Sequence, residues 1–215
     1  MIKKIPTLRL AIIEYVGSWY NGERIKQETR RVILVNITVL NCIPNEFYST
    51  VEKNIKLLTE KDLNNKYDVF TVRDLDIKYC CGCWSCWVKT PGKCIQKDDM
   101  PRILRSMINS DLTIFISPIV MGFVSSLQKK ISDKMIPLVH PYIKICENEC
   151  HHQARYDKYP KLGLLLIEDD LVKKEDVAII NQIYNRTALN MKTELSFSVL
   201  TKGSLEELEY EIKNI

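Results

Sequence analysis

Residues 32–39 read VILVNITV, and this run decides the fold. Its side chains are mostly β-branched and apolar, with no regular polar alternation, which is typical of a strand buried on both faces of a parallel sheet. Comparable runs recur at residues 67–72, 112–116, 162–167 and 195–200. Because helical patterns separate these five runs, the sequence predicts an α/β domain with a parallel sheet covered by helices on both faces.

The helical patterns have recognisable starts. Apolar residues at helical spacing begin near Phe47, and Asp98-Asp99-Met100-Pro101 opens a second helix with an acidic cap and an early proline. A third helix is expected around residues 124–135 and a fourth over residues 175–191. A capping-box pattern at residues 204–207 begins the last one.

Other stretches are predicted to be less regular. The third strand is expected to end at Ser117-Pro118, and residues 137–160 read as a long irregular segment. Residues 1–31 stand outside the alternating pattern as an N-terminal extension of unknown role, so the main domain is assigned to residues 32–215. Within the extension, residues 8–16 resemble an added edge strand and residues 22–30 a short helix or a tether.

Composition narrows the class of protein. The chain has 215 residues, of which 46% are hydrophobic, enough for one globular domain with an extension. The net charge of +4 is spread among interspersed acids and bases, so no nucleic-acid-binding stripe is expected. No apolar run reaches the roughly 18 residues of a membrane span. Arg9 and Glu14 interrupt the only stretch that resembles a signal peptide. The expected location is the cytoplasm.

Residues 79–94 read YCCGCWSCWVKTPGKC and carry the strongest chemical signal. Cys80, Cys83, Cys86 and Cys94 are spaced C-x2-C-x2-C-x7-C, and Cys81 adds a fifth thiol. Four thiolates hold iron–sulfur clusters or a tetrahedral zinc ion. Five of the eight cysteines lie in this window, unlike a disulfide framework, which spreads its cysteines. A [4Fe–4S] cluster, a zinc ion and four free thiols all stay open. Cys80 is preferred over Cys81 as the first ligand of the set, because only Cys80 gives the C-x2-C-x2-C spacing.

The predicted topology places these cysteines where ligands are expected. In open parallel sheets, ligands bind at the carboxyl ends of the strands, near the point where the strand order reverses. Three loops should emerge there, at residues 40–46, at the cysteine window and at residues 117–126. We expect the cysteine loop and the Ser117-Pro118 loop to converge on one pocket at this rim.

The order of these motifs resembles a known family. C-x2-C-x2-C-x7-C is followed by Asp98-Asp99-Met100, then Ser117-Pro118, Gly122 and Ser125. This order resembles the flavodoxin-like NAD(P)H-dependent FMN reductases and, among them, the iron–sulfur flavoproteins, over roughly residues 32–215. The resemblance implies a flavodoxin-like, doubly wound sheet of five strands that binds FMN. It also implies NAD(P)H as hydride donor, a small molecule or protein as electron acceptor, and assembly as a homodimer or homotetramer.

The resemblance also implies which residues contact the cofactors, although no catalytic residue can be assigned. The predicted metal ligands are Cys80, Cys83, Cys86 and Cys94. The predicted hydrogen-bonding residues of the FMN phosphate loop are Thr38, Asn41, Asn45 and Ser49. Trp84 is expected to supply aromatic surface. The predicted contacts of the isoalloxazine ring are Ser117, Pro118, Ile119, Val120, Met121 and Gly122.

One departure supports an alternative reading. Relatives carry a Gly-Ser-Pro-Arg pattern in the phosphate loop, whereas this chain lacks it and has Ile37 in the usual glycine place. The alternative is therefore a degenerate flavodoxin-fold binding or structural module without bound flavin.

Several nearby residues have two readings. Trp84 and Trp87 suit a subunit interface as well as a flavin. His151 and His152 are expected to lie in a polar loop over the cleft rather than to bind metal. Asp98 and Asp99 are expected to cap a helix rather than to act as paired catalytic acids.

Overall fold

The computed structural model describes residues 19–20, 23–24, 34–45 and 49–214. Backbone contacts divide the chain into two units, residues 1–33 and 34–215. In the first unit, β1 (Trp19–Tyr20) pairs antiparallel with β2 (Glu23–Arg24), so these two residues of β2 lie in a strand and not in the short helix considered for residues 22–30. The edge strand expected at residues 8–16 lies outside the described residues, and the role of the extension is not assigned.

The second unit is built on a parallel sheet of five strands, as the sequence predicts. The strands are β3 (Asn36–Asn41), β4 (Lys66–Thr71), β5 (Leu112–Val120), β9 (Lys161–Ile167) and β10 (Leu195–Thr201). Their order in space is β10-β9-β5-β3-β4, and every neighbouring pair is parallel. The chain therefore winds to one side from β3 to β4 and then to the other side through β5, β9 and β10. This is the doubly wound order of flavodoxin-like folds, with its switch point between β3 and β5.

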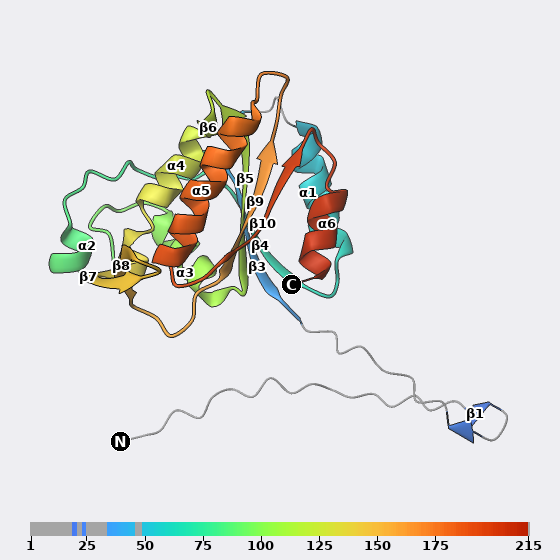
Figure 1. The fold of residues 1–215 in the computed structure, drawn as a ribbon, viewed down its shortest axis with the longest axis horizontal. Helices are drawn as coiled ribbons and strands as arrows, with labels where there is room; N and C mark the ends of the chain where they lie inside the picture. Colours follow the sequence, from blue (N-terminus) through green and yellow to red (C-terminus); the bar gives the residue numbers. More distant parts are fainter. Residues whose placement is uncertain (1–18, 21–22, 25–33, 46–48, 215) are drawn as a thin grey trace. The chain divides into compact units, whose positions relative to one another are not determined.

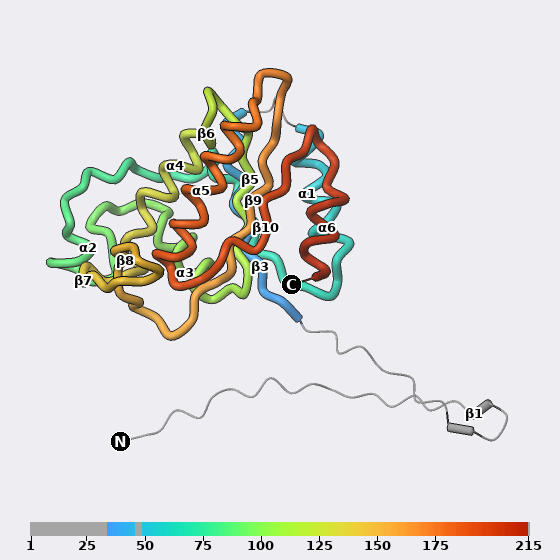
Figure 2. The backbone as a smooth tube through the Cα atoms, in the orientation of Figure 1, coloured from blue at the N-terminus to red at the C-terminus, as the bar shows by residue number. Residues whose placement is uncertain are grey.

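Helices cover both faces of the sheet (Figure 1; the same path is drawn as a tube in Figure 2). The helices α3 (Met100–Asn109), α4 (Ser126–Asp133) and α5 (Lys174–Asn190) lie on one face. The helices α1 (Ser49–Lys61) and α6 (Glu206–Lys213) lie on the other. In the described part of the chain, no helix combines the length and the apolar character needed to cross a membrane.

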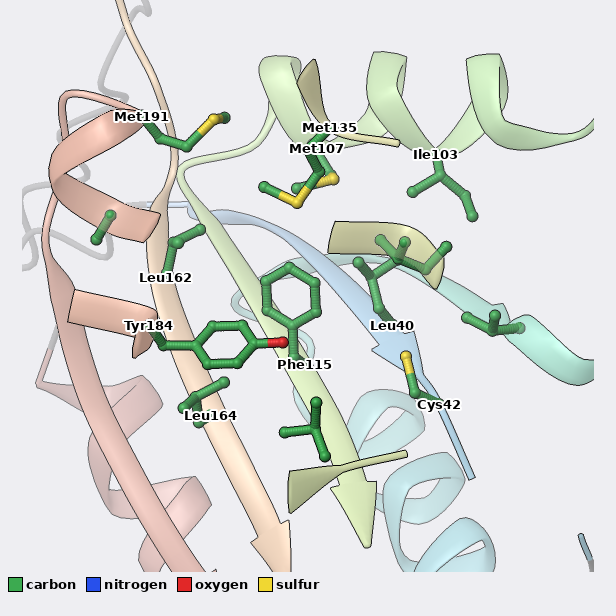
Figure 3. Packing of buried hydrophobic residues seen from close by; sticks show 14 of the residues in the cluster. Leu40, Cys42, Ile103, Met107, Phe115, Met135, Leu162, Leu164, Tyr184 and Met191 are labelled. Atoms are coloured by element: carbon green, nitrogen blue, oxygen red, sulfur yellow. The ribbon is translucent and has the colours of Figure 1, made fainter. Parts of the chain in front are cut away.

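Alternate residues of the central strands feed two hydrophobic cores. Leu40 and Phe115 belong to the cluster beneath α3, α4 and α5, whereas Val39 and Ile114 belong to the cluster beneath α1 and α6. This alternation follows from the two-residue period of a strand. Figure 3 shows the first core, where Phe115 lies among Met107, Met135 and Tyr184. Because both faces are buried, the central strands read as continuous apolar runs.

The segment predicted to be irregular contains a hairpin, so that prediction is wrong. β7 (Val139–Cys146) pairs antiparallel with β8 (Glu149–Ala154). The two-residue turn between them is formed by Glu147 and Asn148, whose φ angles of 51° and 62° match a type I′ hairpin turn. The sequence pattern does not indicate these strands, because their residues are mostly polar and half-exposed and because Glu147 is an uncommon residue for this turn.

Two strand ends also differ from expectation, and both shifts affect the rim. β3 ends at Asn41, two residues beyond the predicted end. β5 continues through Pro118 to Val120 and then turns back as β6 (Phe123–Val124), which pairs antiparallel with the end of β5. Pro118 is tolerated because β3 pairs with β5 only as far as Ile116, so β3 does not need the missing N–H.

Candidate redox site

The loops after β3 and β5 are tied together at the switch point. The Cys42 N–H donates to the Ile116 carbonyl at 2.8 Å, and the Ser125 hydroxyl donates to the Cys42 carbonyl at 2.7 Å. The Ser125 N–H in turn donates to the Ser117 hydroxyl at 2.8 Å, which itself donates to the Pro118 carbonyl. Both hydroxyls are buried and occupied by protein partners. Ser117 and Ser125 therefore shape the rim, and the ring contact expected of Ser117 has no support.

Among the residues predicted for the phosphate loop, Thr38 requires correction. Thr38 lies inside β3, three residues before its end, and is fully buried. Its hydroxyl is 2.7 Å from the Ser106 hydroxyl of α3. Thr38 therefore packs the sheet against α3 and does not reach the rim. Asn45, which precedes α1, and Ser49, the first residue of α1, are both exposed. Their role as phosphate contacts stays a prediction.

Asn41 does lie at the rim, with partners that the sequence did not reveal. Its Oδ1 accepts the Ile43 N–H at 3.1 Å, and its Nδ2 donates to Glu52 Oε1 at 2.7 Å. Glu52, in the first turn of α1, also forms a bidentate ion pair with Arg73, which follows β4. Burial alone would raise the pKa of Glu52, but hydrogen bonds from Arg73 and Asn41 lower that pKa overall. No sequence pattern indicates this pair, because its members are 21 residues apart.

The tip of the β5–β6 hairpin presents apolar side chains to solvent at the same rim. Val120 is 47% exposed and Met121 fully exposed, whereas Ser117 and Ile119 are buried. Met121 and Gly122 have φ angles of 51° and 80°, the left-handed conformation of a tight hairpin turn. Of the residues predicted to contact the ring, Val120 and Met121 are therefore the two that offer an accessible apolar surface.

The two ends of the cysteine loop are joined by Asp98 and Asp99. The Asp99 Oδ2 accepts the Asp76 N–H at 3.0 Å, and the Asp99 N–H donates to the Asp76 carbonyl at 2.8 Å. Asp98 accepts the Lys78 N–H at 3.1 Å through Oδ2 and the Met100 N–H at 3.2 Å through Oδ1. Asp98 thus accepts the N–H of the first residue of α3, whereas Asp99, the N-cap residue, makes no side-chain cap hydrogen bond, and both residues close the base of the loop.

Trp87 anchors the far end of the loop. It lies in the short helix α2 (Ser85–Val88), and its indole N–H lies 3.0 Å from the carbonyls of both Ile136 and Val139. Its ring packs on His152 of β8 at 4.7 Å and stacks on Trp84 at 5.0 Å between centroids. The β7–β8 hairpin and the short helix η3 (Ile136–Leu138) therefore support the cysteine loop. Trp84 is 55% exposed at its outer side.

The thiols of the loop gather around one pocket. Cys80, Cys81, Cys83, Cys86 and Cys94 all line it, together with Trp84, Gln96, Lys134, Ile136 and Pro137. Burial raises the pKa of Cys86, and the neighbouring charges that raise it further belong to Cys94, Cys80 and Cys83.

Cys83, which lies just before α2, is affected by hydrogen bonds from Ser85. The Ser85 hydroxyl and N–H lower the pKa of the Cys83 thiol, because both donors favour the thiolate. Within the described residues, no three His, Cys, Asp or Glu side chains stand close enough to hold one common metal ion. His151 lies beside Glu149, with 3.3 Å between Nε2 and Oε2.

A buried ion pair forms one wall of the cysteine pocket. Lys134 is paired with Asp98, and their side chains are 1% and 0% exposed. The Lys134 ammonium group also donates to Gln96 Oε1 at 3.1 Å, and the Cys94 Sγ is 3.9 Å from the same oxygen. Burial alone would raise the pKa of Asp98, but hydrogen bonds from Lys134 and the Lys78 N–H lower that pKa overall. No motif in the sequence assigns Lys134 or Gln96 to this pocket.

The structure separates the two loops that were expected to share one pocket. Ser125 caps the N-terminal end of α4, whereas Lys134 follows its C-terminal end. An eight-residue helix is about 12 Å long. The cysteine pocket is lined by residues at the Lys134 end and not by the Ser117–Gly122 turn. The rim at the switch point and the cysteine pocket are therefore two places connected by α4.

Comparisons with known proteins agree with this architecture. No family model matches the chain. It is 32% identical over 95 residues to an iron–sulfur flavoprotein of Archaeoglobus fulgidus, an alignment that covers 43% of this chain and 42% of that protein. It is 33% identical over 93 residues to an iron–sulfur flavoprotein of Methanocaldococcus jannaschii, which covers 40% of this chain and 47% of that protein. The matches thus span less than half the length of these relatives.

Solved structures show the same fold at low sequence identity. An FMN-dependent NADH-azoreductase from Bacillus anthracis, solved with FMN, gives a TM-score of 0.54 at 12% identity, covering 84% of this chain and 95% of that one. An NAD(P)H:quinone oxidoreductase from Methanothermobacter marburgensis gives a TM-score of 0.53 at 12% identity, covering 85% and 95%. The chain thus has a flavodoxin-like fold and, over the residues that align, is similar in sequence to two iron–sulfur flavoproteins, as its motifs indicate.

Proposed function

We propose that this protein is an FMN-dependent NAD(P)H oxidoreductase or electron-transfer flavoprotein that carries a [4Fe–4S] cluster on its cysteine loop. The observation that carries the proposal is that all five loop thiols line one pocket, supported by a sheet of flavodoxin-like order. The names of the relatives point to the same cofactors. When bound, FMN accepts a hydride and releases electrons singly, and a cluster carries single electrons.

The switch point suits a flavin ring and phosphate. The rim between β3 and β5 is the place where doubly wound sheets bind their ligands. Val120 and Met121 supply exposed apolar surface there, while the start of α1 offers N–H donors for an anion. Arg73 lies beside this start and donates to the Ile43 carbonyl at 3.4 Å.

The cysteine pocket suits a cluster by the chemistry of its donors. Four thiolates bind a [4Fe–4S] cluster with one thiolate for each iron, so the ligands surround the cluster instead of converging on a single ion. The spacing and the shared pocket of Cys80, Cys83, Cys86 and Cys94 fit this requirement. Trp84, Ile136 and Pro137 supply apolar walls that limit the access of water. Zinc is the second metal that the donor set accepts.

Replacing Val120 by glutamate tests the FMN site. The side chain is half-exposed at the hairpin tip, so the substitution should not disturb the fold. A carboxylate at this place would be desolvated beneath an apolar ring, and we expect FMN affinity to fall by at least roughly tenfold. The measurement is the quenching of flavin fluorescence as protein is added to FMN without oxygen.

The control is Val88→Glu, which places the same charge on a side chain that is 77% exposed in the cysteine loop. This variant should bind FMN like the original protein. If both variants bound FMN with the same affinity, the flavin ring would not lie at this rim. A protein that does not take up FMN at all would support the alternative of a binding or structural module without flavin.

A further inference from the structure

Lys134 is a buried cation that faces the thiols from the end of α4. Its ammonium group is shielded from solvent and lies in the wall of the cysteine pocket. Among the described residues, its hydrogen-bond acceptors are Asp98 and Gln96. An ammonium group has three N–H donors. One donor is thus left for a group inside the pocket.

The location of this charge is not explained by stability alone. Removing an ammonium and a carboxylate from water is costly, and a buried ion pair often gives no more stability than apolar residues of similar volume. The C-terminal end of a helix favours a cation, but an exposed lysine would serve there equally well. Lys134 is instead turned inward, toward Gln96 and the side of Cys94. A further, negatively charged neighbour would account for the third donor.

We propose that Lys134 is a positioning residue of the cysteine site, whose buried charge stabilises the negative charge of the metal-bound thiolates and makes the cluster easier to reduce. The inference rests on the proposed function, because it concerns the cluster assigned there. Four thiolates bring more negative charge than the iron–sulfur core compensates, and reduction adds another negative charge. Cluster potentials depend on net charge and on hydrogen bonds to the sulfurs, and Lys134 offers both.

Gln96 links the cation to a thiol of the set. Its Oε1 accepts from Lys134 at 3.1 Å and lies 3.9 Å from the Cys94 Sγ. Asp98 holds the opposite side of the ammonium group and is fixed by two backbone N–H groups at the base of the loop. The charge of Lys134 therefore has a fixed position relative to the loop that carries the cysteines.

The first experiment measures the reduction potential of the reconstituted protein. The full chain is loaded with ferrous iron and sulfide without oxygen and titrated with dithionite and mediators, with electron paramagnetic resonance to follow the cluster. For Lys134→Met we expect the reduction equilibrium to become roughly tenfold less favourable, a shift of about 59 mV to lower potential for one electron. Lys134→Arg, which keeps the charge, should restore most of the difference.

Two further variants keep this test interpretable. Lys129→Met removes the charge of a lysine that is 54% exposed on the same helix, so it should leave the potential unchanged. Lys134→Met combined with Asp98→Asn leaves no unpaired charge and guards against unfolding of the single variant. Its potential should lie between those of Lys134→Met and the original protein. Equal potentials for Lys134→Met and Lys129→Met would overturn the inference.

A second experiment does not need the cluster. Cadmium added to the cluster-free protein forms thiolate complexes whose charge-transfer absorbance can be titrated. Because thiols become negatively charged thiolates when they bind cadmium, a buried ammonium group beside them favours binding, and Lys134→Met should bind cadmium at least roughly tenfold more weakly than Lys129→Met does. If the original protein takes up no iron and sulfide, the assignment of a cluster fails, while the cadmium titration still decides the role of Lys134. Equal cadmium affinities would reject that role.

Discussion

Replacing Cys86 by serine is expected to abolish retention of the cluster. Cys86 is a buried member of the C-x2-C-x2-C-x7-C set, so no outside ligand can easily take its place. Changes in residues that only support metal ligands already cost 10–100-fold in affinity, and loss of a ligand should cost more than about a hundredfold. Iron and acid-labile sulfide, measured after anaerobic reconstitution and gel filtration, provide the readout.

Cys81→Ser is the matched control for this experiment. Cys81 lies in the same loop and lines the same pocket, but it does not belong to the regular C-x2-C-x2-C-x7-C spacing. We expect this variant to keep its iron and sulfide. If Cys81→Ser loses the cluster while Cys80→Ser keeps it, the ligand set is shifted by one residue. If Cys86→Ser loads fully, the pocket is not the cluster site.

The largest expected loss of stability follows from Asp98→Ala. This change leaves the buried Lys134 ammonium group without its carboxylate and removes the acceptor of the Lys78 and Met100 N–H groups. Breaking a buried ion pair by removing one partner typically costs about 3–5 kcal/mol of unfolding free energy. The measurement is urea unfolding of the metal-free protein, followed by circular dichroism.

The double variant Asp98→Ala with Lys134→Met should recover much of this loss, because it leaves no unpaired buried charge. A single variant that loses less than about 1 kcal/mol would show that Lys134 reaches water.

The ion pair between Lys134 and Asp98 also predicts that stability depends on pH. The folded state lowers the pKa of Asp98 below its ordinary value of 3.8, so the stability it contributes is present above that pH and is lost as the pH falls below it.

The sequence predicted the sheet because burial on both faces leaves a continuous apolar signal in each central strand. It could not predict the ends of β3 and β5, which depend on how far neighbouring strands pair and not on residue type. Thr38 lies in the interior of β3, inside the run already predicted to be a strand, because its assignment to the phosphate contacts came from the family resemblance alone. The β7–β8 hairpin was missed because polar, half-exposed strands carry little periodic signal.

The site was predictable where chemistry is local in the chain. The spacing of the cysteines in residues 79–94 predicted a metal or redox site, and the structure brings all five thiols of this loop to one pocket. The charged partners were not predictable, because Lys134 meets Asp98 across 36 residues and Arg73 meets Glu52 across 21. The hydroxyls of Ser117 and Ser125 matched a family pattern by position, yet the structure uses both to join the loops at the switch point.

The central claim is that one chain holds a flavin at its switch point and a cluster on its cysteine loop. The most direct measurement is the content of iron, acid-labile sulfide and FMN in protein that is purified and supplied with these components without oxygen. The account predicts about four iron and four sulfide ions for each chain, with one FMN. Retention of zinc alone, or of neither metal nor flavin, would contradict it.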